Sequence, residues 1–266
     1  MYILRKLFNF LSFLLEKLGY KLLISKITSN ISYELIDKNS WEPFIDKNNY
    51  FIKIYNDAIN KSKSAHSNSL LKQLRFYSLF NIVENIVKDG NYENFIECGC
   101  WNGHSSYAIS TILKNNSFNK NFYIFDSFEG GLSKKKDEDI NLNRYIQNET
   151  EILNQKNYFI SSHSEFQKLM NEFTFVKIYK GWIPKVFENI NNIKASFIHI
   201  DLDLYQPTYD AIDFLYNSLE EGGIIVCDDY NCSDFPGAKL AIDEFMKKNL
   251  YKMFYEIPLG GCIIIK

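Results

Sequence analysis

From residue 94 onward, short apolar runs alternate with segments whose apolar residues recur at helical spacing. We expect strands over 94–98, 121–126, 173–179, 196–201 and 223–228, and helices over 104–114, 208–219 and 238–248. This alternation is typical of a parallel sheet with right-handed helical crossovers. Two last strands, over 251–257 and 261–266, are joined by a link so short that it implies an antiparallel hairpin. The sequence therefore predicts an α/β fold with a Rossmann-like, mostly parallel, seven-stranded sheet.

The first part of the chain has a different pattern. Residues 2–24 show the apolar spacing of an amphipathic helix, whereas 27–69 is polar and irregular. Charges interrupt 2–24, so we do not expect it to span a bilayer, which takes about 20 mostly apolar residues. It could pack on the main domain or on a second copy of the chain, or lie on a membrane surface. We predict a helical N-terminal extension or cap over 1–69 and one main domain over 70–266.

Charge and cysteine usage limit the partners of this chain. The formal net charge of -2 lacks the basic surplus that is typical of nucleic-acid binders, so we expect no nucleic-acid partner. The five cysteines have no metal-ligand spacing and should be free thiols in a reducing compartment: Cys98, Cys100, Cys227, Cys232 and Cys262. We therefore expect a cytoplasmic protein, with peripheral membrane contact through 2–24 as the alternative.

A glycine turn follows the first expected strand, in the sequence ECGCWNG from Glu97 to Gly103. Gly99 allows a tight turn and a close approach to the backbone, and Gly103 allows close packing where the next helix begins. Glu97 could reach the charged amino group of a cofactor. Asp126, at the tip of the second expected strand, could accept hydrogen bonds from both ribose hydroxyls. This pattern favours an adenosine-containing cofactor, although a turn without a ligand and a simple loop cap are the alternatives.

Two pairs of aspartates follow neighbouring strands of the expected sheet: Asp201 with Asp203, and Asp228 with Asp229. Carboxylates that converge in one cleft repel each other unless a cation neutralises them. An all-oxygen ligand set suits Mg²⁺, Mn²⁺ or Ca²⁺ rather than zinc. The alternative, capping of the following helices, could explain one or two of these residues.

The segment 129–172 is longer than a simple crossover requires. It contains three lysines at 134–136 next to three acidic residues at 137–139. Two interpretations remain open: a solvated loop followed by ordinary helices, or a mobile lid over the site.

Six short motifs, within about residues 70–266, resemble the TylF-type sugar O-methyltransferases, which include macrolide and aminocoumarin deoxysugar methyltransferases. They are FIECG at 95–99, FDSFEG at 125–130, KGW at 180–182, FIHIDLDLYQPT at 197–208, EGGIIVCDDY at 221–230 and GAKLAIDEF at 237–245. The resemblance implies a class I methyltransferase fold, S-adenosylmethionine (SAM) as methyl donor and Mg²⁺ as the metal. Residues 1–69 show no motif of this family.

The resemblance also implies roles for individual residues. Asp201, Asp228 and Asp229 would bind the metal, and Asp203 would act as the general base. The predicted cofactor contacts are Glu97, Gly99, Gly103, Ser105, Asp126, Ser127, Phe128 and Asp201.

The predicted activity is transfer of a methyl group from SAM to a sugar hydroxyl, assisted by Mg²⁺. The acceptor sugar could belong to a nucleotide sugar, a lipid-linked glycan, a surface polysaccharide or a secondary metabolite. One alternative is a nucleotide-sugar glycosyltransferase, because these enzymes also use a DxD sequence with a metal. A non-catalytic adenosine-binding or scaffold protein is the other alternative, and it would bind no metal at the aspartates.

Overall fold

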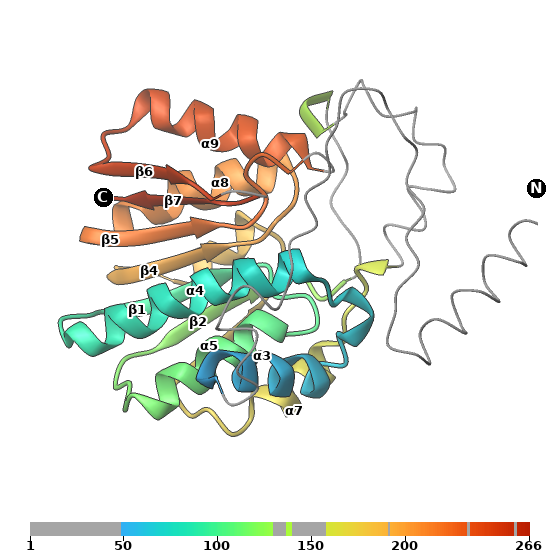
Figure 1. Cartoon of the computed structure of the whole chain (residues 1–266). Helices are drawn as coiled ribbons and strands as arrows, with labels where there is room; N and C mark the ends of the chain where they lie inside the picture. The colour runs from blue at the N-terminus through green and yellow to red at the C-terminus, as the bar shows by residue number, and fades with distance from the viewer. Residues whose placement is uncertain (1–48, 130–136, 140–157, 191, 233–234, 258–259) are drawn as a thin grey trace, which may run out of the picture. The chain divides into compact units, whose positions relative to one another are not determined.

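The computed structural model describes the part of the chain that lies within Asp46–Lys266 (Figure 1). Its described residues are 49–129, 137–139, 158–190, 192–232, 235–257 and 260–266. The amphipathic helix predicted over 2–24 and much of the segment 129–172 lie outside these ranges. Among the described helices, none combines the length and the apolar character that crossing a membrane requires.

Seven strands form one sheet in the order β3-β2-β1-β4-β5-β7-β6 (Figure 1). The strands are β1 (Asn94–Cys98), β2 (Phe122–Asp126), β3 (Val176–Lys180), β4 (Ala195–Ile200), β5 (Leu219–Cys227), β6 (Met253–Glu256) and β7 (Cys262–Ile265). Strands β1 to β5 pair in parallel, and β7 is antiparallel to both β5 and β6. The predicted class I methyltransferase fold, with its antiparallel C-terminal hairpin, is therefore confirmed.

Helices cover both faces of the sheet. They are α3 (Tyr50–Lys61), α4 (Leu70–Asp89), α5 (His104–Asn115), α7 (His163–Met170), α8 (Tyr205–Leu215) and α9 (Pro236–Lys248). Short 3₁₀ turns are η2 (Ala65–Ser67), η3 (Asp137–Asp139), η4 (Lys185–Asn189) and η5 (Tyr216–Ser218). Residues of α3, α4, α5 and α7 share one core cluster, and residues of α8 and α9 share the other.

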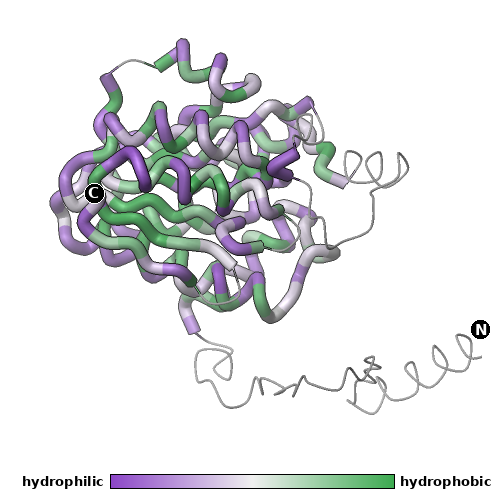
Figure 2. The backbone as a smooth tube through the Cα atoms, turned by 90° about the horizontal axis from the view of Figure 1, so that it is seen from above, coloured by the Kyte–Doolittle hydropathy of each residue, from purple (hydrophilic) through white to green (hydrophobic). Residues whose placement is uncertain are grey.

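The central strands supply side chains to both cores. In β1, Phe95 lies in the core with α4 and α5, and Ile96 lies in the core with α8 and α9. In β4, Phe197 likewise lies in the core with α4 and α5, and Ile198 lies in the core with α8 and α9. Successive side chains of a strand point to opposite faces, so a strand buried on both faces needs a continuous apolar run. Figure 2 shows hydrophobic segments, in green, in the interior of the described part of the chain.

Several element boundaries differ from the prediction, among them the start of β5, which lies at Leu219 rather than at 223. The helix expected over 208–219 begins at Tyr205, because Pro207 lies in the first turn, where its missing N–H is not needed. It ends at Leu215, and Leu219 instead begins β5 by pairing with Ala195. The third strand begins at Val176 rather than at 173, because residues 173–175 form a turn before it.

Helix α3 lies within the segment 1–69 and contributes to the core that α4 and α5 share. Tyr55 packs edge-on against Phe76 of α4, with ring centroids 5.4 Å apart. It also packs against His104 at the start of α5, with ring centroids 4.6 Å apart. The end of the predicted extension therefore contributes to the main hydrophobic core, and the division at residue 69 stays a prediction.

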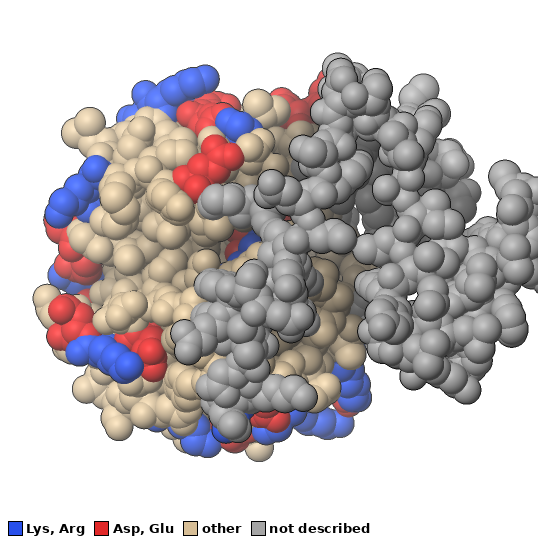
Figure 3. Space-filling model, in the orientation of Figure 1, with Lys and Arg blue, Asp and Glu red and all other residues tan. Residues whose placement is uncertain are grey.

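Acidic and basic side chains are interspersed on the described surface in the view of Figure 3. Within that described surface, no continuous basic face is visible. This distribution agrees with the small net charge of -2.

Candidate active site

The predicted site residues gather at the carboxyl ends of four neighbouring strands. Asp126 ends β2, Asp201 follows β4 and Asp228 follows β5. The hydrogen-bond ladder continues past the strands, since the Asp201 amide donates to the Cys98 carbonyl at 2.9 Å. The Asp228 amide likewise donates to the Ile200 carbonyl at 3.0 Å. Strand pairing therefore brings both aspartates to one edge of the sheet, where open α/β sheets bind their ligands.

Three of the four aspartates form a compact carboxylate group, made of Asp201, Asp203 and Asp229. Each offers an oxygen, and these oxygens lie within 4.8 Å of one another. The Asp203 amide donates to Asp229 Oδ2 at 3.0 Å. Asp203 adopts a left-handed backbone with φ of 61°, a conformation that aspartate tolerates better than most residues. The local backbone thus turns Asp203 back toward the next strand.

The electrostatics of this carboxylate group favour a cation. Burial, followed by the negative charge of Asp228, raises the pKa of Asp201 to about 6. Burial and the charges of Asp203 and Asp201 raise the pKa of Asp229 well above its ordinary value. Clustered carboxylates that resist ionisation are stabilised by a proton or by a metal ion. Three oxygen donors of this kind fit Mg²⁺ or Mn²⁺, so the residues present suit the predicted metal.

Asp228 has different neighbours from the other three aspartates. Its Oδ1 lies 3.3 Å from His199 Nε2, and its carbonyl accepts a hydrogen bond from Arg75 Nη1 at 3.0 Å. Burial would raise the pKa of Asp228, but Arg75 and His199 outweigh this effect and lower it. The carboxylate is therefore held as an anion by two cationic groups. Its predicted role as a metal ligand stays a prediction.

Glu97 is fully buried and contacts protein groups through both carboxylate oxygens. Its Oε1 lies 2.9 Å from His199 Nδ1, and its Oε2 accepts a hydrogen bond from the Ser106 hydroxyl. Glu97 and His199 are register partners on β1 and β4, which explains why their side chains meet. The predicted contact between Glu97 and the cofactor stays a prediction.

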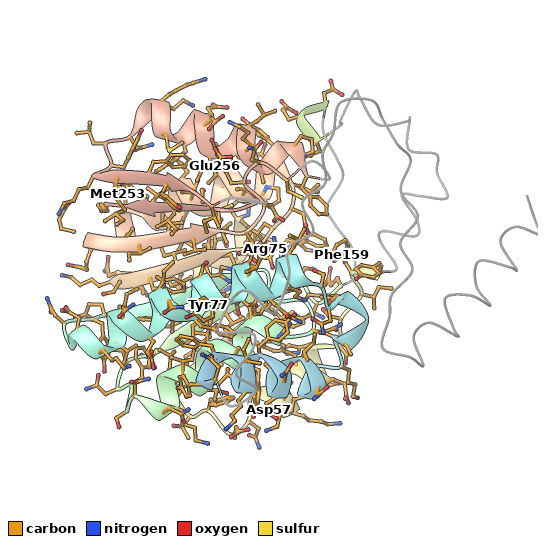
Figure 4. The ribbon with its side chains drawn as sticks, in the orientation of Figure 1. Asp57, Arg75, Tyr77, Phe159, Met253 and Glu256 are labelled. Carbon is orange, nitrogen blue, oxygen red and sulfur yellow. The ribbon has the colours of Figure 1, made fainter. Side chains whose placement is uncertain are left out.

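Two cations of α4 face the aspartates, and neither was among the residues predicted from the sequence. Lys72 and Arg75 are three residues apart, so they lie on one side of the helix, and Figure 4 shows Arg75 on the side toward the strand ends. Burial lowers the pKa of Lys72, and the charge of Asp201 partly opposes this shift. The spacing was visible in the sequence, but nothing there indicated that this helix lies over the carboxylates.

The glycine turn brings the β1 end against the β4 end. Gly99 has φ of 84°, and an ideal Cβ there would lie 1.9 Å from the Asp201 carbonyl oxygen. Gly103 has φ of 87°, and an ideal Cβ there would lie 2.8 Å from Phe166 of α7. Both positions therefore require glycine for close approach within the protein. The predicted approach of a cofactor to Gly99 stays a prediction.

Asp126 organises the two loops beside the expected cofactor. Its Oδ2 accepts hydrogen bonds from the amides of Cys100 at 2.9 Å and Trp101 at 3.1 Å. Its Oδ1 accepts one from the Phe128 amide at 2.8 Å. A carboxylate has about four acceptor positions, so Oδ1 can accept one further donor, such as a ribose hydroxyl.

The other predicted cofactor residues lie around the same two loops. Ser105 is buried in the first turn of α5, and Ser127 Oγ accepts a hydrogen bond from the Glu129 amide at 3.4 Å. Phe128 has φ of 51° and packs against His163, with ring centroids 4.9 Å apart. These positions lie at the ends of β1 and β2, and their cofactor contacts stay predictions.

Comparisons with known proteins identify relatives over most of the chain. The family model described as Macrocin-O-methyltransferase (TylF) matches residues 21–262. Demethyldecarbamoylnovobiocin O-methyltransferase from Streptomyces niveus is 23% identical over 233 residues, which cover 85% of this chain and 84% of that protein. A second relative, from Streptomyces olivaceus, is 27% identical over 172 residues, which cover 62% of this chain and 63% of that protein. Its name is 8-demethyl-8-(2,3-dimethoxy-alpha-L-rhamnosyl)-tetracenomycin-C 4'-O-methyltransferase.

The solved structure of the O-methyltransferase NovP supports the fold. It superposes with a TM-score of 0.55 at 22% sequence identity, covering 70% of this chain and 78% of that chain.

Proposed function

Because this chain belongs to the TylF macrocin-O-methyltransferase family and is a SAM-dependent O-methyltransferase, we propose that it methylates a sugar hydroxyl with the help of Mg²⁺. The observation that carries this proposal is the group formed by Asp201, Asp203 and Asp229, whose oxygens lie within 4.8 Å of one another. A sugar acceptor is supported by the name of the relative from Streptomyces olivaceus, which acts on a rhamnosyl-bearing compound.

The carboxylates divide into metal ligands and a base. Asp201 and Asp229 would hold the divalent cation, with Asp228 as the third ligand. When bound, this cation supplies a positive charge that makes a coordinated sugar hydroxyl easier to ionise. Asp203 would accept the proton of a hydroxyl held there, and its membership of the same group of oxygens supports this role.

The loops at the ends of β1 and β2 would hold the methyl donor. SAM supplies the methyl group when it is bound. Asp126 would accept a hydrogen bond from the ribose at Oδ1. That oxygen accepts one amide hydrogen bond, whereas Oδ2 already accepts two, so Oδ1 has room for a further donor. Ser105, Ser127 and Phe128 would lie beside the cofactor, and the turn at Gly99 would line it. Rigid loops of this kind contribute to the rate by fixing the alignment of the methyl group with the acceptor oxygen.

Residues 1–69 would form a cap on the domain over 70–266. Within the cap, we retain two alternatives for 2–24: packing against protein, in this chain or in a second copy, and contact with a membrane surface. A cytoplasmic location is supported by the five cysteines, which all lie within the described residues and form no disulfide there.

Calorimetry tests the proposed function most directly. We expect SAM or S-adenosylhomocysteine to bind, with and without Mg²⁺, and no UDP-sugar to displace it. Binding of a UDP-sugar in place of SAM would contradict the proposal and support the glycosyltransferase alternative. The acceptor class can be found by mass spectrometry of glycans from cells with and without the gene. In cells without the gene, the acceptor glycan should be lighter by the mass of one CH₂ group.

A further inference from the structure

A chain of buried polar groups crosses the sheet beneath α4 and α5. Glu97 on β1 and His199 on β4 are 0% exposed, and Asp228 after β5 is 5% exposed. His199 Nδ1 lies 2.9 Å from Glu97 Oε1, and His199 Nε2 lies 3.3 Å from Asp228 Oδ1. One imidazole ring therefore bridges two carboxylates that come from different strands.

The sheet register explains why the three groups meet. Glu97 pairs with His199, and His199 pairs with Val226 on β5. Asp228 is two residues beyond Val226, so the alternation of side chains along an extended chain directs it to the same face. The residues that precede this polar row on the same face are apolar, since Phe95, Phe197 and Val226 lie in the core with α4 and α5.

Stability alone does not explain this arrangement. Replacing a buried ion pair with packed apolar residues is often neutral or stabilising, and apolar residues fill the rest of this face. Asp228, however, is the member of the chain that lies beside the carboxylate group, because it directly precedes Asp229 and its amide donates to the carbonyl of Ile200, the residue before Asp201. The function of the polar chain is therefore best sought at that carboxylate.

We propose that His199 is a positioning residue that orients the Asp228 carboxylate for the metal, and that Glu97 acts by orienting His199. This inference rests on the proposed function. The Asp228 main chain is fixed on both sides, by the Ile200 carbonyl at 3.0 Å and by Arg75 Nη1 at 3.0 Å. With the main chain fixed, the contact of Oδ1 with His199 determines where Oδ2 points. Residues that hold metal ligands in this way typically contribute a factor of about 10 to 100 to metal affinity.

Two substitutions at residue 199 separate the two contacts of the ring. The amide nitrogen of glutamine can replace Nε2, and the amide nitrogen of asparagine can replace Nδ1. His199→Gln therefore retains a donor toward Asp228, and His199→Asn retains one toward Glu97. The experiment measures Mn²⁺ binding to the full chain by electron paramagnetic resonance, with S-adenosylhomocysteine present, and checks folding by circular dichroism.

We expect His199→Asn to bind Mn²⁺ about 10- to 100-fold more weakly than the unmodified protein, whereas His199→Gln should stay close to it. Unchanged affinity in both variants would overturn the inference. An equal loss in both would also overturn it, because that result indicates a general structural role. If the unmodified protein binds no Mn²⁺, the metal part of the proposed function fails first, and this inference fails with it.

A third variant, Glu97→Gln, keeps the test decisive if the variants at residue 199 do not fold. It has the same shape as the native side chain but replaces a charge-assisted hydrogen bond with a weaker neutral one. We expect weaker Mn²⁺ binding and unchanged affinity for S-adenosylhomocysteine. The opposite result, normal Mn²⁺ binding with weakened S-adenosylhomocysteine binding, would place Glu97 at the cofactor and overturn the inference.

Discussion

The carbonyl oxygen of Asp201 occupies the space that a side chain at Gly99 would need, because an ideal Cβ there would lie 1.9 Å from that oxygen. The glycine of the β1 turn and the first aspartate after β4 are thus a packed pair. This contact connects the turn expected to line the cofactor with one of the carboxylates expected to hold the metal.

Gly99→Ala should disturb both halves of the site. The added methyl group must displace the Asp201 main chain, and the left-handed backbone adds a cost of about 1–2 kcal/mol. We expect a loss of stability well above that cost and weakened binding of Mn²⁺ and S-adenosylhomocysteine, measured by chemical denaturation and calorimetry. Gly90→Ala is the control, because Gly90 has a similar φ of 79° but nothing lies within 4 Å of its ideal Cβ. Equal stability losses in the two variants would contradict the packed pair.

Asp203→Asn should separate binding from turnover. The substitution retains the size of the side chain but removes the base, so we expect normal binding of S-adenosylhomocysteine and a turnover rate lower by a factor of about 10² to 10⁴. The measurements are calorimetry and a methyl-transfer assay. Asp213→Asn, on the exposed side of α8, is the matched control and should keep its activity. A near-normal rate in Asp203→Asn would remove this residue as the base.

Removing the metal should abolish activity and lower stability. Chelation by EDTA leaves the carboxylates of Asp201, Asp203 and Asp229 to repel one another, and added Mg²⁺ should reverse the effect. A ligand at 100 times its Kd stabilises a protein by about 2.7 kcal/mol, so Mg²⁺ should raise the thermal midpoint measurably. In Asp229→Asn, this rise should be much smaller. Activity that does not change with EDTA would contradict the metal proposal.

His104 should make the protein less stable as the pH falls. Burial, and then the charge of Lys72, lower the pKa of His104 to about 3, while the hydrogen bond to the Tyr55 carbonyl partly opposes the shift. The unfolded chain takes up a proton near pH 6.5, but the folded protein does not. The free energy of unfolding should therefore fall by up to about 1.4 kcal/mol per pH unit between pH 6.5 and 3, and be unaffected by this residue above that window.

Denaturation of His104→Phe across this pH range tests the prediction. The phenylalanine ring can retain the packing against Tyr55 and Phe76, so its stability near pH 8 should resemble that of the unmodified protein. Its loss of stability on acidification should be shallower. Parallel pH profiles of the two proteins would show that His104 does not cause the effect.

The class of fold, and the edge of the sheet at which the aspartates gather, could both be predicted from the residue pattern alone. Apolar runs long enough to be buried on both faces require a covered parallel sheet. Asp126, Asp201 and Asp228 each come at the end of such a run, and the carboxyl ends of parallel strands meet at one edge. These conclusions depend only on how apolar residues and aspartates are spaced within short segments, and a single sequence shows that spacing.

Which side chains meet could not be predicted in this way, because it depends on how distant parts of the chain pack together. The neighbours of β4 are β1, about a hundred residues earlier in the chain, and β5, so the bridge from Glu97 through His199 to Asp228 follows from strand order. The positions of Lys72 and Arg75 above the carboxylates depend on how α4 packs on the sheet. Residue spacing specifies which face of a strand or helix a side chain occupies, but not which other element covers that face. That choice is made when the whole core packs together, because the burial of apolar surface acts over all the elements at once.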